Sequence, residues 1–134
     1  MGTRADFYVG VGKPAEWLGS IAWDGYPDGI DEAVLAAKNP EEFRAAVNHF
    51  LSDRRDATLP NQGWPWPWDD SHTTDYAYRF VDGKVESLCF GQLIIGADED
   101  GDAIYSEESQ EFPNMAAVKN ITLGERSGVI IFTA

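Results

Sequence analysis

The stretch from residue 76 to residue 90 reads YAYRFVDGKVESLCF. Two runs rich in aromatic and β-branched residues, Tyr76 to Val81 and Lys84 to Phe90, flank the dipeptide Asp82-Gly83. Aspartate followed by glycine tolerates the positive backbone angles of a two-residue turn, whose twist matches that of paired strands. The stretch therefore predicts a β-hairpin, and it points to a protein whose main sheet is antiparallel.

The same reasoning predicts further strands on both sides of this hairpin. Asp6 to Val11 and Trp17 to Trp23 flank the turn formers Gly12-Lys13-Pro14. Leu93 to Ala97 and Ala103 to Tyr105 flank an acidic, glycine-containing tip. Strand-like patterns also cover residues 116–123 and 128–134, with a helical turn around Met115 to Val118 as the alternative to the first of them. Most of the sheet is thus expected to be built from hairpins.

Two helices are expected between the first hairpin and the central one. The first spans Ile30 to Lys38. The second begins at Asn39-Pro40-Glu41-Glu42, which offers an N-cap, a proline at the first helical position and a glutamate at the third, and runs to about residue 53. Its apolar stripe should cover one sheet face. The prediction is a single α+β domain over residues 1–134, mainly antiparallel, with two helices inserted after the first hairpin.

The charge balance excludes several classes of partner. The 134 residues include 23 Asp plus Glu against 10 Lys plus Arg, which gives a formal charge of −13. A protein that neutralises phosphates needs a basic surface, so direct nucleic-acid binding and adsorption to anionic membranes are disfavoured. No export signal or membrane-spanning run is found, and the lone Cys89 agrees with a reducing compartment. A cytoplasmic protein with basic or neutral partners is expected.

Signatures of catalysis or cofactor binding are weak throughout. The glycines before Lys13 are followed by Pro14 where a phosphate loop needs Ser or Thr, and Cys89 has no basic neighbour in sequence to activate it. The acidic run at residues 98–102 departs from the calcium-loop pattern, because Gly101 precedes Asp102. We therefore expect no cofactor, no metal and no catalytic residue.

The segment Trp64-Pro65-Trp66-Pro67-Trp68 forms the middle of a polar connection. Alternate prolines favour an extended backbone. The three tryptophans either fold back over the protein or present an amphipathic platform, since tryptophan is enriched in interface hot spots. Trp64, Trp66 and Trp68 are accordingly candidate partner-binding residues.

Acidic residues are concentrated in the last third of the chain. Between Val85 and Val118 there are eight acidic residues and no lysine or arginine. Such a surface either keeps the protein soluble or attracts a basic partner. The candidate partner-binding carboxylates belong to Asp98, Glu99, Asp100, Asp102, Glu107, Glu108 and Glu111.

The chain resembles small uncharacterised proteins of bacteriophages and prophages. The resemblance rests on Met1-Gly2-Thr3-Arg4, on Trp23-Asp24-Gly25-Tyr26-Pro27-Asp28-Gly29 and on Thr74-Asp75-Tyr76-Ala77-Tyr78, and it extends loosely through the central hairpin. It implies a phage setting in a bacterial host cytoplasm, without any catalytic motif. Small acidic phage proteins are often inhibitors of host machinery, including restriction and CRISPR defence complexes, and some mimic the charge of DNA.

Three functional hypotheses follow. The leading one is a non-enzymatic, anti-CRISPR-like interaction protein that binds and inhibits a basic, nucleic-acid-handling host complex. The second is a small hydrolase that uses Asp69, Asp70 and His72 in a tryptophan-lined cleft. The third is a virion or accessory protein whose charge only solubilises it, with no inhibitory role.

Overall fold

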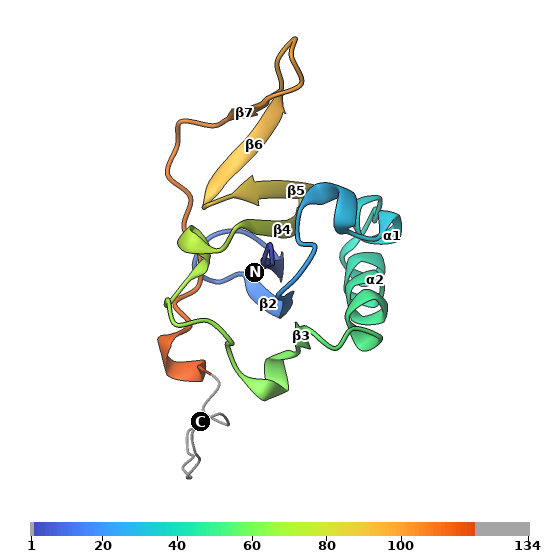
Figure 1. The fold of residues 1–134 in the computed structure, drawn as a ribbon, viewed down its shortest axis with the longest axis vertical. Helices are drawn as coiled ribbons and strands as arrows, with labels where there is room; N and C mark the ends of the chain where they lie inside the picture. Colours follow the sequence, from blue (N-terminus) through green and yellow to red (C-terminus); the bar gives the residue numbers. More distant parts are fainter. Residues whose placement is uncertain (1, 120–134) are drawn as a thin grey trace.

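The structure, a computed structural model that describes residues 2–119, is built on one seven-stranded sheet. The strand order is β3-β2-β1-β4-β5-β6-β7. Neighbouring strands pair antiparallel except β1 and β4, which are parallel. The strands are β1 Ala5–Val9, β2 Glu16–Ile21, β3 Ala57–Thr58, β4 Tyr76–Val81, β5 Lys84–Cys89, β6 Gln92–Ala97 and β7 Ala103–Tyr105 (Figure 1). The predicted α+β class and mainly antiparallel sheet are confirmed.

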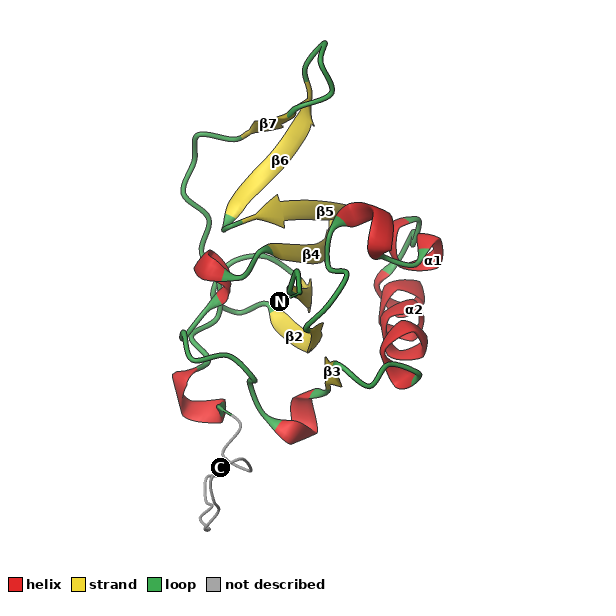
Figure 2. Ribbon diagram, in the orientation of Figure 1, coloured by secondary structure: helices red, strands yellow, loops and turns green. Residues whose placement is uncertain are grey.

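Two α-helices follow the first hairpin, as predicted (Figure 2). They are α1 Glu32–Leu35 and α2 Pro40–Ser52, so α1 is much shorter than the predicted helix at residues 30–38. Asn39 caps α2 by accepting a hydrogen bond from the Glu42 N–H at 2.8 Å. Short 3₁₀ helices form at Pro27–Gly29, Pro60–Gln62, Ser71–Thr73 and Ala116–Val118.

Helix α2 covers one face of the sheet. Its buried Phe43, Val47 and Leu51 join a core with Phe7 of β1 and Tyr78 of β4. The helix approaches β2 closely at Gly19. There an added Cβ would lie 2.5 Å from the Leu51 Cδ1 and 2.8 Å from the Thr58 carbonyl oxygen. The Leu51 side chain could move away, but the Thr58 carbonyl belongs to the backbone of β3, so a side chain at this position would disturb the pairing of β2 with β3.

The opposite face of the sheet is covered by irregular chain instead of a helix. We call it the loop face. It packs against residues 64–68 and against residues 106–119, a segment that we call the strap. The second core lies here and contains Tyr8, Trp17, Trp64, Ala77, Leu88, Phe112 and Met115. The sheet is thus buried on both faces over β1 and β4.

The structure differs from the predicted strands at two other places, the end of β5 and residues 116–118. Strand β5 ends at Cys89, and Phe90 with Gly91 forms a second turn in which both residues have positive φ, 48° and 80°. Residues 116–118 form a 3₁₀ helix, which is the alternative that the sequence left open there, and the Val118 carbonyl oxygen accepts a hydrogen bond from the Trp64 N–H at 2.7 Å. The rest of the strand predicted at residues 116–123 and the one at residues 128–134 lie outside the described residues.

Candidate functional site

The β6–β7 hairpin projects away from the rest of the fold (Figure 1). Strand β6 forms only two pairs with β5, Leu88↔Leu93 and Cys89↔Gln92, and then pairs with β7 instead. Every residue from Ile95 to Tyr105 is exposed. The predicted hairpin is confirmed, and its position leaves both of its faces open to a partner.

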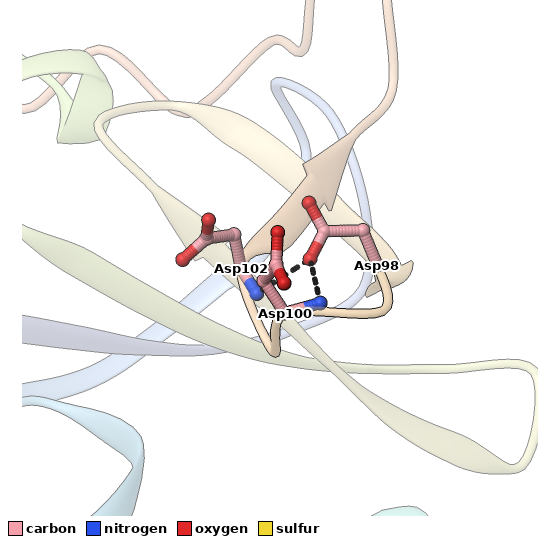
Figure 3. A group of neighbouring side chains, drawn as sticks. All are labelled: Asp98, Asp100 and Asp102. Atoms are coloured by element: carbon pink, nitrogen blue, oxygen red, sulfur yellow. Dashed lines mark hydrogen bonds between the residues drawn. The ribbon is translucent and has the colours of Figure 1, made fainter.

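Three aspartates gather at the tip of this hairpin (Figure 3). Carboxylate oxygens of Asp98, Asp100 and Asp102 lie within 4.8 Å of one another. The Asp98 Oδ1 accepts hydrogen bonds from the N–H groups of Asp100 and Asp102, both at 2.9 Å. Two unit charges at this separation repel by about 0.9 kcal/mol in water, so the tip attracts cationic groups. Glu99 is exposed beside them. We call Asp98, Glu99, Asp100 and Asp102 the acidic tip.

Large apolar side chains lie exposed below the acidic tip. Ile95 is 61% exposed, and Ile104 and Tyr105 are exposed on the facing strand. Phe90, in the turn between β5 and β6, is 56% exposed. Exposed large apolar residues near charged ones are typical of a protein interaction site. None of these four residues was a candidate in the sequence, because their strand pattern indicates burial equally well.

The three remaining candidate glutamates belong to the strap. Glu107, Glu108 and Glu111 are all exposed, and they follow the hairpin directly. Gln110 holds this part of the strap in place: its carbonyl oxygen lies 2.7 Å from the His72 Nε2, and its Oε1 accepts from the Arg79 Nη2 at 2.9 Å. The exposed acidic residues therefore continue along the chain from the tip into the strap.

The tryptophan loop lies in a different region from the acidic tip (Figure 1). Trp64 is only 1% exposed and belongs to the loop-face core, so it cannot contact a partner in this conformation. Trp66 and Trp68 are half-buried and stacked, with ring centroids 5.8 Å apart. The Arg4 guanidinium lies over both rings, at 5.9 and 5.0 Å from their centroids. The structure separates the predicted tryptophan and carboxylate sets.

A buried polar network explains why the tryptophan loop folds back. Asp6 is fully buried on the loop face. Its Oδ1 accepts hydrogen bonds from the Ser20 Oγ at 2.6 Å and the Trp66 Nε1 at 2.7 Å. Its Oδ2 accepts from the Ser71 Oγ at 2.7 Å, and Ser71 also bonds to the Tyr8 hydroxyl at 2.6 Å. Burial raises the pKa of Asp6, and these hydrogen bonds act against that rise.

Asp6 is a structural residue that the sequence analysis did not identify. The available signal was its position: it alternates with Ala5 and Phe7 in a strand that is apolar on both sides. In a strand buried on both faces, a carboxylate must find hydrogen-bond donors.

Of the three residues of the hydrolase hypothesis, two lie together and one pairs elsewhere. The Asp69 carboxylate pairs with Lys119 at 2.8 Å. Asp70 and His72 are brought together, with the Asp70 Oδ1 2.9 Å from the His72 Nδ1, but the other ring nitrogen of His72 faces the strap. Ser71 is directed into the buried network. In residues 2–119, no hydroxyl or thiol is hydrogen-bonded to His72, which leaves this group without a positioned nucleophile.

No protein-family model, curated protein or solved structure matches this chain. Within the described residues, no helix has both the length and the apolar character needed to cross a membrane.

Proposed function

We propose that this protein is a non-enzymatic interaction protein that acts through the β6–β7 hairpin. Its partner is a basic surface on a nucleic-acid-handling complex of a bacterial host, and binding blocks that surface. The observation that carries the proposal is the projecting hairpin, which is exposed from Ile95 to Tyr105 and ends in the acidic tip. Carboxylates then occupy positions that phosphates would take on the partner.

Charge placement supports a basic partner. The acidic tip and the strap glutamates are exposed and follow one another along the chain, and between Val85 and Val118 the chain has no lysine or arginine. A surface of this kind accelerates encounter with an oppositely charged partner by roughly 10- to 1000-fold, and the effect weakens with salt. Steering of this type sets the association rate more than the final affinity.

The exposed apolar residues of the hairpin supply the contacts that charge alone does not. Ile95, Ile104 and Tyr105 lie just below the carboxylates on the same hairpin. Apolar and aromatic side chains that become desolvated provide most of the free energy of binding at interfaces. The hairpin therefore combines steering at its tip with anchoring along its strands.

The phage resemblance supports the inhibitory part of the proposal and its location. A phage protein of this type acts in the host cytoplasm, where restriction and CRISPR complexes expose basic grooves for nucleic acid. An acidic hairpin that occupies such a groove competes with DNA or RNA.

The test is charge reversal at the tip, with a matched reversal elsewhere. In the first variant, Asp98, Asp100 and Asp102 are changed to Lys. In the control, three exposed acidic residues on the helical side are changed to Lys: Asp28, Glu32 and Glu41. Association with an identified partner is followed by stopped flow at several salt concentrations. We expect the tip variant to associate at least tenfold more slowly and with a reduced salt dependence. An unchanged rate and salt dependence in the tip variant contradicts charge mimicry.

A further inference from the structure

Strands β5 and β6 separate after their two pairs and leave a cleft between them. The cleft has a volume of about 480 Å³ and is lined by residues 84–87 of β5 and 93–96 of β6. Figure 1 shows the two strands diverging from their common turn. Beyond Leu88↔Leu93, no described strand pairs with β5 on the side away from β4. An open strand edge therefore lies inside the sheet.

The register of β4 and β5 defines which backbone groups face this cleft. The two-residue turn Asp82-Gly83 closes on the pair Val81↔Lys84. Alternate residues of an antiparallel pair bond to each other, so Glu86 and every second residue of β5 bond to β4. The N–H groups of Val85 and Ser87 then point toward the cleft. Such an edge is a template for another strand.

We propose that this cleft binds an extended basic segment of a partner by strand addition along β5. The inference deepens the proposed function and rests on it for the basic character of the partner. Val85, Leu93 and Ile94 line the cleft with apolar surface, which suits the alternate side chains of an added strand. Four residues of added strand span roughly 13 Å, the length of the open part of β5.

The acidic tip follows the end of β6 at the open end of the cleft, where Lys84 of β5 also lines it. Strand β6 runs from the closed end, at Gln92, to Ala97, and the tip follows directly at Asp98. A segment that enters between the strands therefore passes the tip carboxylates as it leaves, and basic residues at that end are favoured there. A second copy of this chain is disfavoured as the occupant, because two copies of charge −13 repel each other.

The experiment is amide hydrogen exchange by NMR on the full chain, alone and with two probe peptides. The basic probe is the peptide Lys-Val-Arg-Val-Lys-Val-Arg, and the acidic probe has Glu at each basic position. In the free protein we expect slow exchange at Glu86 and Leu88 and fast exchange at Val85 and Ser87. The basic probe should slow exchange at Val85 and Ser87 at least tenfold, and the acidic probe should leave it unchanged.

Two variants test the backbone contact itself. Val85→Pro removes an N–H that faces the cleft without removing a bond to β4, and proline is tolerated at such an open edge. Val85→Ala is the matched control for lost packing. We expect the proline variant to bind the basic probe at least tenfold more weakly than the alanine variant. Ser87→Pro provides the same comparison with Ser87→Ala if Val85→Pro does not fold.

Three results would overturn the inference. The first is that the amides of Val85 and Ser87 are already protected in the free chain. The others are that both probes bind equally, or that the basic probe binds the proline and alanine variants equally. The exchange experiment needs no natural partner, so its failure is distinct from failure of the proposed function. That function is judged by the salt dependence of partner association.

Discussion

Replacement of Asp6 is the perturbation for which the structure predicts the largest and most specific effect. In Asp6→Ala, three donors lose their acceptor. Two are buried, the Ser20 hydroxyl and one hydroxyl of the Ser71 and Tyr8 pair, and the third is the half-buried Trp66 indole N–H. Asp6→Asn is the matched control, since its amide keeps an acceptor for two donors and offers an N–H to Ser71, which can turn its own hydroxyl toward Tyr8.

The magnitude follows from the number of unpaired groups. A buried donor left without a partner costs about 1–3 kcal/mol. Three such donors cost about 6 kcal/mol at the middle of that range, and relief from burying a carboxylate offsets part of this. We expect Asp6→Ala to lower the free energy of unfolding by about 3 kcal/mol, and Asp6→Asn by about 1 kcal/mol. Because the network holds Trp66, the alanine variant should also loosen the tryptophan loop.

Urea unfolding followed by tryptophan fluorescence and by circular dichroism measures both variants. A dependence on pH gives an internal check. Burial raises the pKa of Asp6, so the folded state holds that proton more tightly than the unfolded state. As the pH rises above the unfolded pKa of 3.8, the wild type should therefore lose stability relative to Asp6→Asn. Losses below about 1 kcal/mol for Asp6→Ala, or equal losses in both variants, would refute a hydrogen-bonded anchor.

Three other substitutions give clear expectations. Phe90 adopts a φ of 48°, which asparagine tolerates better than phenylalanine. Phe90→Asn should therefore raise the free energy of unfolding by about 1 kcal/mol in a thermal unfolding experiment, and a destabilised variant argues against this turn. Asn39→Ala removes the cap of α2 and should cost about 1 kcal/mol in urea, whereas no loss would mean that the cap is dispensable. Burial tends to raise the pKa of Asp56, but hydrogen bonds from Arg54 and the Trp23 N–H outweigh it, and the pKa is lowered. The stability that this carboxylate contributes is present above pH 3.8 and is lost below it. The difference in free energy of unfolding between the wild type and Asp56→Asn should therefore narrow in acid. A difference that stays constant with pH contradicts a lowered pKa for Asp56.

Local sequence signals predicted the hairpins and the start of α2. Asp82-Gly83 has the positive backbone angles that the dipeptide favours, and Asn39 caps the helix as its spacing indicates. Both features depend only on neighbours in the chain. The same is true of the acidic tip, whose glycine and aspartates form a tight turn by themselves.

Features that depend on distant parts of the chain could not be predicted. The parallel pairing of β1 with β4 joins strands more than 60 residues apart. The turn at Phe90 uses an aromatic residue where a turn pattern calls for Asn or Asp. Strand β6 leaves β5 after two pairs, and no local pattern in the sequence marks that point. The cleft and the exposed apolar side chains of the hairpin are found where the two strands separate. The sequence therefore predicts where the acidic residues lie in the chain, but not the surface that surrounds them.

The most direct test of the account is recovery of partners from a bacterial host lysate by the wild type, by the tip variant with Asp98, Asp100 and Asp102 changed to Lys, and by the control with Asp28, Glu32 and Glu41 changed to Lys. Bound proteins are identified by mass spectrometry, and each is assayed for nucleic-acid binding in the presence of the wild type. We expect the wild type and the control to recover a nucleic-acid-handling complex and to inhibit it. The tip variant should neither recover nor inhibit that complex. Recovery of the same complex by all three proteins, or of none by the wild type, contradicts the account.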